Sequence, residues 1–346
     1  MTNAPEPRPR KSRWRRLIGV GLGIAVVAAT FFFVLPRIAN YGDVWAVVRE
    51  LSWAQIGALL LATVLNLVTF APPWMVALPG LGFRRAFVLT QASTASTYIA
   101  PGGAAVGVAL AYAMLRGWGF SGGPVGLAVA VTGIWNQLAL LGFPAVALAL
   151  LTLKQEQNAL LQTVATIGLA VFLLAAGAFA LGLSTPKFAR FAGETAARVV
   201  NWGLRLVRRG PVGWTGESFV RFRNEAIGLL RHRWHLLTVG TLAGQLTVFA
   251  LLLVSLRVLD VSAGEVSAVE AFAAWSLVRL LGSLPITPGG IGVVELGLTT
   301  ALVGFGGEDA EVVAAVLVYR FLTIVPTLVL GLVAGAMWRR LRPAET

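Results

Sequence analysis

The sequence predicts an all-α, polytopic membrane protein with six full transmembrane helices and two re-entrant helical hairpins arranged as an inverted repeat. Its composition is 57% hydrophobic and only 12% charged, which is too apolar for a water-exposed globule. Several apolar runs reach the length of about 20 residues that crosses a bilayer. Two further apolar segments are interrupted by Pro-Gly-Gly, at Pro101–Gly103 and Pro288–Gly290, and a helix cannot continue unbroken through that tripeptide.

Composition also restricts the function. The chain has no cysteine, which excludes disulfides, thiolate metal sites and thiol catalysis. Its net charge of +13 lies in segments that flank apolar runs, which favours anionic lipid headgroups over nucleic acid as the partner. The two histidines, His232 and His235, lack a nearby carboxylate and suit interfacial anchoring better than metal binding. We therefore expect no metal, no cofactor and no nucleic-acid partner.

The predicted elements follow in order along the chain. Residues 1–16 form a basic cytoplasmic tail, residues 17–338 the transmembrane domain and residues 339–346 a second cytoplasmic tail. The first apolar run exceeds the ~7–15 residues usual for a signal peptide, so we interpret it as an uncleaved anchor. The six full spans are predicted at Leu17–Leu35, Trp53–Leu78, Val125–Leu153, Ala159–Leu183, His235–Leu256 and Val312–Trp338.

The segments Arg85–Leu115 and Val266–Gly304 contain the Pro-Gly-Gly breaks, and each could be a kinked crossing or a re-entrant hairpin of two half-helices. The positive-inside rule separates these alternatives. With two re-entrant hairpins, most of the 28 lysines and arginines fall on the cytoplasmic side, whereas with two crossings they divide evenly between the sides. The charge bias therefore predicts re-entrant hairpins and places both termini in the cytoplasm, and the expected location is the plasma (inner) membrane.

The unit of span, hairpin and span occurs at residues 53–153 and again at residues 235–338. The additional span between the two units turns the second unit over, which makes the repeat inverted. The hairpin tips would then approach each other near the middle of the bilayer, an arrangement typical of alternating-access transporters. The predicted tip residues are Pro101, Gly102, Gly103, Pro288, Gly289, Gly290 and Gly292.

Between the repeats, residues 184–234 form a long polar segment. At about 100° per residue, its charged side chains share one arc of a helix and its apolar side chains share the neighbouring arc. The charged arc holds Lys187, Arg190, Glu194, Arg198, Arg205, Arg208 and Arg209, and the apolar arc holds Phe188, Val199, Trp202 and Leu206. This pattern predicts an interfacial helix on an anionic inner leaflet, and a solvated connector is the alternative.

Four residues of the second repeat are candidate functional groups at membrane depth, namely Arg279, Glu295, Tyr319 and Arg320. Charges inside a bilayer cost at least about 2.5–3.5 kcal/mol each unless they are paired or hydrated, and they mark functional sites. We expect Glu295 to pair with Arg279 or Arg320, and lipid headgroups to bind at this pair. The alternative is an ion pair that only locks the hairpin to the last span.

The first hairpin is polar but uncharged between Thr90 and Tyr98. We expect its hydroxyl and amide groups to line a hydrated groove that hydrogen-bonds a lipid headgroup. The candidate residues are Gln91, Thr94, Tyr98 and, on the following span, Asn136. The alternative is that the hydroxyls bond the preceding helical turn, that the small residues permit close helix packing, and that Asn136 joins helices.

The decapeptide from Ile286 to Glu295, followed by Tyr319-Arg320, Pro326 and Gly331, resembles the lysylphosphatidylglycerol synthase transmembrane-region family of flippase-like membrane proteins. The similarity covers roughly Arg37–Trp338. Members are similar to the membrane half of enzymes that make and flip lysylated phosphatidylglycerol, and to proteins of polyprenyl-phosphate sugar pathways. The resemblance implies motif positions at Pro288, Gly289, Gly290, Gly292, Glu295 and Arg320.

The first Pro-Gly-Gly copy departs from this family pattern. Ala104, Ala105 and Val106 stand where many members carry a glutamate, so a symmetric pair of carboxylates is not expected. The sequence ends at Thr346 without a soluble aminoacyl-transferase domain. On that basis, lipid lysylation itself is not an expected activity.

We expect a lipid transporter or flippase that moves a phospholipid or lipid-linked substrate with a polar or charged headgroup. The sequence shows no Gly-rich phosphate loop, nucleophile elbow or pair of catalytic carboxylates, so no catalytic residue is predicted and an enzyme is not expected. The alternatives are a membrane-embedded transferase and an accessory scaffold in aminoacyl-lipid or polyprenyl-phosphate sugar synthesis. Membrane lipids are the expected partners, and a lipid-modifying synthase or glycosyltransferase is a candidate protein partner.

Overall fold

The computed structural model describes residues 45–46, 49–99, 103–153, 159–206, 215–283 and 288–338, and the regular secondary structure of these ranges is helical, without strands. Within them, five helices are long and apolar enough to cross a membrane, at Trp53–Ala77, Gly122–Leu153, Thr166–Ser184, Gly216–Val258 and Asp309–Gly335. The prediction of an all-helical, multi-pass membrane protein is therefore confirmed. The predicted first span and both tails lie outside the described residues.

The first described span is broken into two helices. α4 (Trp53–Thr69) begins at Ser52, whose hydroxyl accepts from the Gln55 amide while the Gln55 side chain accepts from the Ser52 amide. This reciprocal capping satisfies two amides that a helix start leaves without partners. α5 (Pro72–Ala77) follows after a short break, because the two prolines at its start lack the amide protons that a continuing helix needs. The single span predicted here is thus two consecutive helices.

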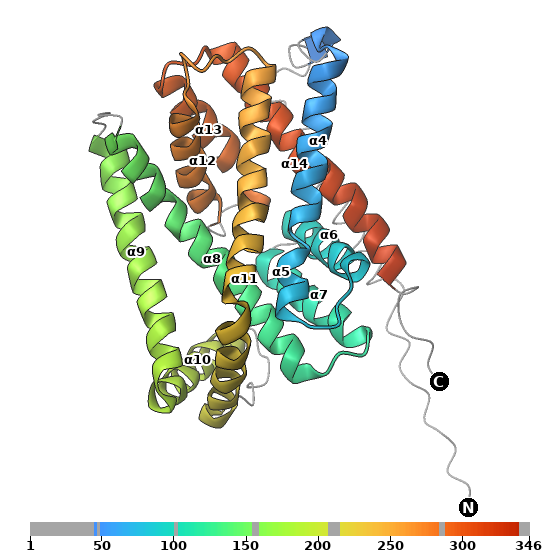
Figure 1. The fold of residues 1–346 in the computed structure, drawn as a ribbon, viewed down its shortest axis with the longest axis vertical. Helices are drawn as coiled ribbons and strands as arrows, with labels where there is room; N and C mark the ends of the chain where they lie inside the picture. The colour runs from blue at the N-terminus through green and yellow to red at the C-terminus, as the bar shows by residue number, and fades with distance from the viewer. Residues whose placement is uncertain are drawn as a thin grey trace, which may run out of the picture.

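Each Pro-Gly-Gly segment joins two short antiparallel helices. The first pair is α6 (Phe83–Ile99) and α7 (Gly103–Gly117), which we call hairpin one. The second pair is α12 (Ala268–Gly282) and α13 (Val293–Gly304), with a short 3-10 turn at Pro288–Gly290 before α13, which we call hairpin two. Hairpin one lies in the lower half of Figure 1 and hairpin two in the upper half.

Glycines permit close packing within each hairpin. A Cβ atom on Gly107 of α7 would lie 2.8 Å from the Ser93 carbonyl oxygen of α6. A Cβ atom on Gly297 of α13 would lie 3.1 Å from the Val278 side chain of α12. Small residues at such contacts let helices approach closely in membranes, where the hydrophobic effect does not drive helices together. The two arms of each hairpin are therefore in direct contact.

The long helices α8 (Gly122–Leu153), α9 (Ala159–Ser184) and α11 (Gly216–Val258) form the scaffold beside the hairpins (Figure 1). α11 has 43 residues and starts well before His235, where hydropathy predicts the span to begin. Its first turns are polar and basic, so hydropathy does not detect them, although Thr215 caps the helix with a side-chain hydrogen bond. The helix therefore extends beyond the predicted span at its N-terminal end, and where α11 enters the membrane stays a prediction.

The polar segment between α9 and α11 contains the helix α10 (Pro186–Leu206). α10 packs against α9 and against the start of α11, where Gly193 lies on the Phe219 ring and Arg190 forms a 2.5 Å ion pair with Glu217. A helix is thus present where the amphipathic pattern predicts it, and part of its surface contacts protein. Its position on a membrane surface stays a prediction, and the end of the predicted charged arc, beyond α10, lies outside the described residues.

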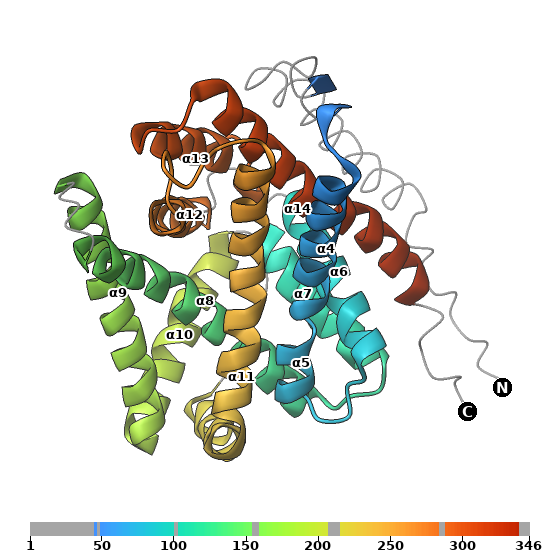
Figure 2. The ribbon, with the colours of Figure 1, turned by 45° about the horizontal axis from the view of Figure 1, so that its top comes forward.

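The last helix, α14 (Asp309–Met337), crosses the molecule diagonally in Figures 1 and 2 and contacts both hairpins. Its contact with α6 is close, because a Cβ atom on Gly331 would lie 2.9 Å from the Gln91 carbonyl oxygen. Pro326 lies inside the helix, between its two hairpin contacts. α14 therefore joins the two repeats.

A large core cluster lies between hairpin two, α8, α11 and α14. Its centre is an aromatic group in which Phe143, Phe249, Phe272 and Trp275 have ring centroids 5.1–5.8 Å apart. Aromatic pairs at these distances contribute about 0.5–1.5 kcal/mol each beyond the burial of their area. Because two of the rings belong to α12, this group fixes the rotation of α12 against α8 and α11.

Candidate functional site

A buried ion pair links hairpin two to α14. The Nε of Arg320 lies 2.6 Å from Oε1 of Glu295. Glu295 is completely buried and Arg320 is 5% exposed, so water does not screen either charge. Glu295 comes from the first turn of α13, and Arg320 follows the buried Tyr319 on α14. The predicted pair between Glu295 and a buried cation is therefore present, and the cation is Arg320.

The same two side chains hold the turn of hairpin two. Oε2 of Glu295 accepts from the Gly292 amide at 2.7 Å, and Nη2 of Arg320 donates to the Gly289 carbonyl at 3.2 Å. Glu295 thereby caps α13, and a carboxylate at a helix N-terminus also interacts favourably with the helix dipole. The φ angles of Gly289 and Gly292 are 62° and 85°, a region that glycine adopts without steric cost. The turn thus depends on both the ion pair and the glycines.

The turn of hairpin two contacts the end of hairpin one. A Cβ atom on Gly289 would lie 2.6 Å from Cε1 of Tyr98, close to the end of α6, so the ring leaves no room for a side chain there. Ile291 from hairpin two and Ile99 from hairpin one pack against the same small apolar cluster. The predicted approach of the two tips is therefore seen as a direct contact.

A chain of polar side chains joins hairpin two to the scaffold. Nη2 of Arg279 donates to Oε1 of Gln245 at 2.7 Å, and Nε2 of Gln245 donates to Oδ1 of Asn136 at 2.5 Å. The guanidinium carbon of Arg279 also lies 5.6 Å from the ring centroid of Trp275, within the range of a cation–π contact. The pairing of Arg279 with Glu295, one of the two expected pairings, is not among the ion pairs of the described residues. Arg279 instead bonds a neutral amide.

The hydroxyl groups of α6 bond within their own helix. Four of them donate to the carbonyl three residues earlier, namely Thr90, Ser93, Ser96 and Thr97. The buried amide of Gln91 donates to the Leu67 carbonyl of α4 at 3.1 Å, and Thr94 is exposed. These donors serve helix packing, which is the alternative to a headgroup-binding groove along α6.

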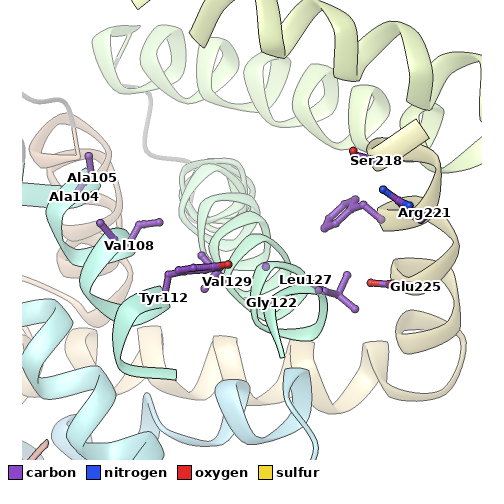
Figure 3. A pocket seen from close by; sticks show the side chains of 14 residues that line it. Ala104, Ala105, Val108, Tyr112, Gly122, Leu127, Val129, Ser218, Arg221 and Glu225 are labelled. Atoms are coloured by element: carbon purple, nitrogen blue, oxygen red, sulfur yellow. The ribbon is translucent and has the colours of Figure 1, made fainter. Parts of the chain in front are cut away.

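An open groove of about 970 Å³ lies beside hairpin one, between α7, α8 and the start of α11 (Figure 3). Its wall on α7 is formed by Ala104, Val108 and the ring of Tyr112, and its wall on α11 carries Arg221 and Glu225. Pockets with apolar walls and a few polar groups at defined positions are typical ligand sites. The groove therefore has the size and the mixed walls of a site for an amphipathic ligand.

The sequence profile of the lysylphosphatidylglycerol synthase TM region matches residues 19–331. The chain belongs to this family. No curated protein sequence matches the chain. Membership agrees with the resemblance carried by the second Pro-Gly-Gly motif, and together with the apolar helices it identifies a membrane-embedded protein, consistent with a role related to membrane lipids.

In this protein of the lysylphosphatidylglycerol synthase transmembrane-region family, four of the predicted site residues form two groups. Glu295 and Arg320 meet at the turn of hairpin two, while Arg279 and Asn136 are joined through Gln245. Sequence reasoning missed Gln245, which is 1% exposed; a glutamine within an apolar run is the signal that could have found it. The predicted tip residues at positions 101 and 102 lie outside the described residues.

The groove beside hairpin one was not predicted from the sequence. The groove residues on α11 escaped prediction because that part of the chain reads as a polar loop. No group of three or more histidine, aspartate or glutamate side chains that could hold a metal ion occurs in the part of the chain that the structure describes.

Proposed function

We propose that this protein translocates lipids, as a flippase-like transporter that moves a phospholipid or lipid-linked molecule with a polar or charged headgroup across the plasma membrane. One observation carries the proposal: two hairpins broken at Pro-Gly-Gly meet where the turn of one lies against Tyr98 of the other. Broken helices beside buried polar groups are typical of substrate sites within the bilayer. Here those groups are the Glu295–Arg320 pair and the polar chain that includes Arg279.

The lengths of the hairpin helices support re-entrant hairpins. The four helices have 17, 15, 15 and 12 residues. At 1.5 Å per residue they measure about 18–26 Å, which is less than the ~30 Å of bilayer hydrocarbon. The connections of hairpin two lie at the upper end of Figure 1, and the connection from hairpin one to α8 lies towards the lower end. This arrangement suits hairpins that enter from opposite sides, as an inverted repeat of residues 53–153 and 235–338 requires, with both termini cytoplasmic.

The groove beside hairpin one is the proposed point of lipid entry. The apolar side chains of α7 would contact acyl or prenyl tails, while Arg221 and Glu225 of α11 would contact a headgroup (Figure 3). Tails that stay in hydrocarbon while the headgroup moves between helices avoid the cost of bringing polar groups into lipid.

Reconstitution of the purified protein into phospholipid vesicles tests the proposal. Phosphatidylglycerol with a fluorescent nitrobenzoxadiazole label would be placed in both leaflets, and dithionite would bleach the label that reaches the outside. We expect wild-type protein to expose the inner-leaflet label, and Gly289→Val to do so at least several-fold more slowly, because its side chain would collide with Tyr98.

Gly57→Ala is the matched control, because no atom lies within 4 Å of a Cβ placed at that glycine, and it should translocate like the wild type. The assay would be repeated with a labelled polyprenyl-phosphate sugar. If vesicles with the wild-type protein exposed neither labelled lipid faster than protein-free vesicles do, the result would contradict translocation. That result would favour a membrane-embedded transferase or a scaffold.

A further inference from the structure

The two arginines near the turn of hairpin two have different electrostatic surroundings. Arg320 is neutralised by Glu295 at 2.6 Å. Arg279 contacts the amide of Gln245 and the ring of Trp275, and among the described residues no carboxylate lies within ion-pair distance of it. Arg279 is partly buried, so its charge is neither paired with a carboxylate nor fully hydrated.

No other acidic residue is placed to neutralise Arg279. Glu270 lies in the first turn of α12, whereas Arg279 lies in the last turn, and nine residues of helix correspond to about 13 Å. The acidic residues of α14 also lie in its first turn, at the end away from the turn of hairpin two. Residues 100–102 and 284–287, which adjoin the two tips, include no acidic residue. The last turn of α12, next to the tip of hairpin two, therefore carries a positive charge at Arg279 that no acidic residue of the same turn balances.

The hydrogen bonds of the polar chain fix the position of the Arg279 guanidinium. Gln245 accepts from Arg279 and donates to Asn136, so its amide orientation is determined on both sides. A guanidinium has five N–H donors, and Gln245 engages one Nη atom. The remaining donors have the planar geometry that binds a phosphate through two parallel hydrogen bonds.

We infer that Arg279 binds the phosphate group of the transported lipid, with Gln245 and Asn136 as positioning residues, while the Glu295–Arg320 pair fixes the hairpin turn. An unpaired arginine in a membrane-spanning region is costly, and an anionic ligand removes that cost when it binds. The inference rests on the proposed function for the ligand being a lipid, and it narrows the substrate class to lipids whose headgroup carries a phosphate.

Binding to the full-length protein in a neutral detergent tests this assignment. The probes are dioctanoyl phosphatidylglycerol, inorganic phosphate and dioctanoylglycerol, which lacks the phosphate. We expect the wild type to bind the phospholipid and not dioctanoylglycerol, and Arg279→Gln to weaken phospholipid binding by about ten-fold or more. Arg279→Lys should lose less because it keeps the charge, and Arg84→Gln, at an exposed arginine of α6, should bind like the wild type.

Gln245→Glu gives a second test that does not remove the arginine. The new carboxylate would lie where Oε1 of Gln245 now meets Arg279 at 2.7 Å, and Asn136 can reverse its amide to donate to it. We expect an unfolding temperature at or above that of the wild type together with loss of phospholipid binding. A purely structural role for Arg279 predicts undiminished binding in this variant.

The outcomes separate the inference from the function on which it rests. Undiminished phospholipid binding in both Arg279→Gln and Gln245→Glu would overturn the inference, even if the wild type translocates lipid. Equal affinity of the wild type for inorganic phosphate and for the phospholipid would overturn the lipid assignment. Phospholipid binding that depends on Arg279, in a protein that does not translocate, would contradict the proposed function alone.

Discussion

Glu295 makes contacts that serve three purposes at once. It neutralises Arg320, it accepts from the Gly292 amide at the start of α13, and it holds the arginine that bonds the Gly289 carbonyl. Removing one partner of a buried pair leaves the other charge uncompensated, which costs more than the pair itself contributes. The contacts of Glu295 are structural, and a direct part in headgroup binding stays a prediction.

Glu295→Gln should therefore lower the free energy of unfolding by about 3 kcal/mol, because it leaves Arg320 buried without its counter-charge. Arg320→Gln should have a similar effect, and the double variant should regain part of the loss. Thermal and denaturant unfolding of the purified proteins would measure this double-mutant cycle. If Glu295→Gln unfolds like the wild type but no longer translocates lipid, the pair acts on the substrate and not on the fold.

Gly289→Ala should also destabilise the protein, for two separable reasons. Its φ of 62° costs a residue with a side chain about 1–2 kcal/mol, and its Cβ would collide with the Tyr98 ring. Adding Tyr98→Ala removes the collision and leaves the backbone cost, so the double variant should unfold at a higher temperature than Gly289→Ala alone. A double variant less stable than both single variants would mean that the tips do not touch.

The charged residues could be located from the sequence, but the choice between their partners could not. Arg279 and Arg320 are equivalent candidates for Glu295 by spacing and depth. The rotation of α12 decides between them, because it turns Arg279 towards Gln245 on α11. That rotation follows from the packing of aromatic rings between α12, α8 and α11, which spacing within one segment does not reveal.

At the scale of elements, hairpin one packs against α14 as well as within its own two arms. The Gly331 face of α14 meets Ala95 and the Gln91 carbonyl of α6, and Gly107 of α7 meets α6 from the other arm. α6 therefore lies between two glycine contacts. We call the contact of Gly331 with α6 the glycine seam. It tolerates little added volume, since a close backbone approach leaves no space for a methyl group.

Gly331→Ala should lower the unfolding temperature, whereas Gly335→Ala, one turn further along the same helix, should leave it unchanged or raise it. A Cβ at Gly331 would lie 2.9 Å from the Gln91 carbonyl oxygen, and a Cβ at Gly335 would meet no atom within 4 Å. Alanine otherwise favours a helix over glycine by about 1 kcal/mol. Thermal unfolding of both variants beside the wild type measures these changes. Equal shifts of the unfolding temperature in the two variants would contradict a close contact at Gly331.

Hydropathy found the elements whose whole length is apolar and missed changes within them. The Pro-Gly-Gly motifs located both hairpins within the apolar segments, because this tripeptide breaks a helix whatever its surroundings. Hydropathy missed the polar first turns of α11, which a capped helix continues through, and the break before α5, because the prolines there lie in an apolar run. Averaged hydropathy records neither helix caps nor missing amide protons.

For the whole molecule, charge separates the two ends. The end with α10 carries Lys187 and the arginines of α10 and early α11. The connections at the other end carry Asp260, Glu265 and Glu308. Basic residues are retained on the cytoplasmic side of membrane proteins. This separation favours a cytoplasmic α10 and places the connections of hairpin two outside.

Single cysteines test this orientation cleanly, because the chain contains no cysteine of its own. Lys187→Cys, at an exposed position of α10, should react with an impermeant maleimide only after the cells are permeabilised. Ala263→Cys, exposed in the connection between α11 and α12, should react in intact cells. Labelling of both positions from outside would contradict hairpins that enter from opposite sides.

α14 contacts the hairpins on both sides of its internal proline. Arg320, which holds the turn of hairpin two, precedes Pro326, and Gly331, which packs on hairpin one, follows it. The proline has no amide proton, so the Leu322 carbonyl one turn earlier loses its helical partner. Sharp bends in helices occur at such positions.

We therefore expect the angle of α14 at Pro326 to influence the separation between the two tips. A change in the bend at the proline would move the Arg320 contact with hairpin two relative to the Gly331 contact with hairpin one. Gly289 and Tyr98 could then part while the ion pair and the glycine seam stay intact. Ala95 of hairpin one also packs against Ile324, which precedes the proline. The apolar cluster at the two tips is small, and it joins Ile99 and Ile291 to Ile324 and Leu328 of α14.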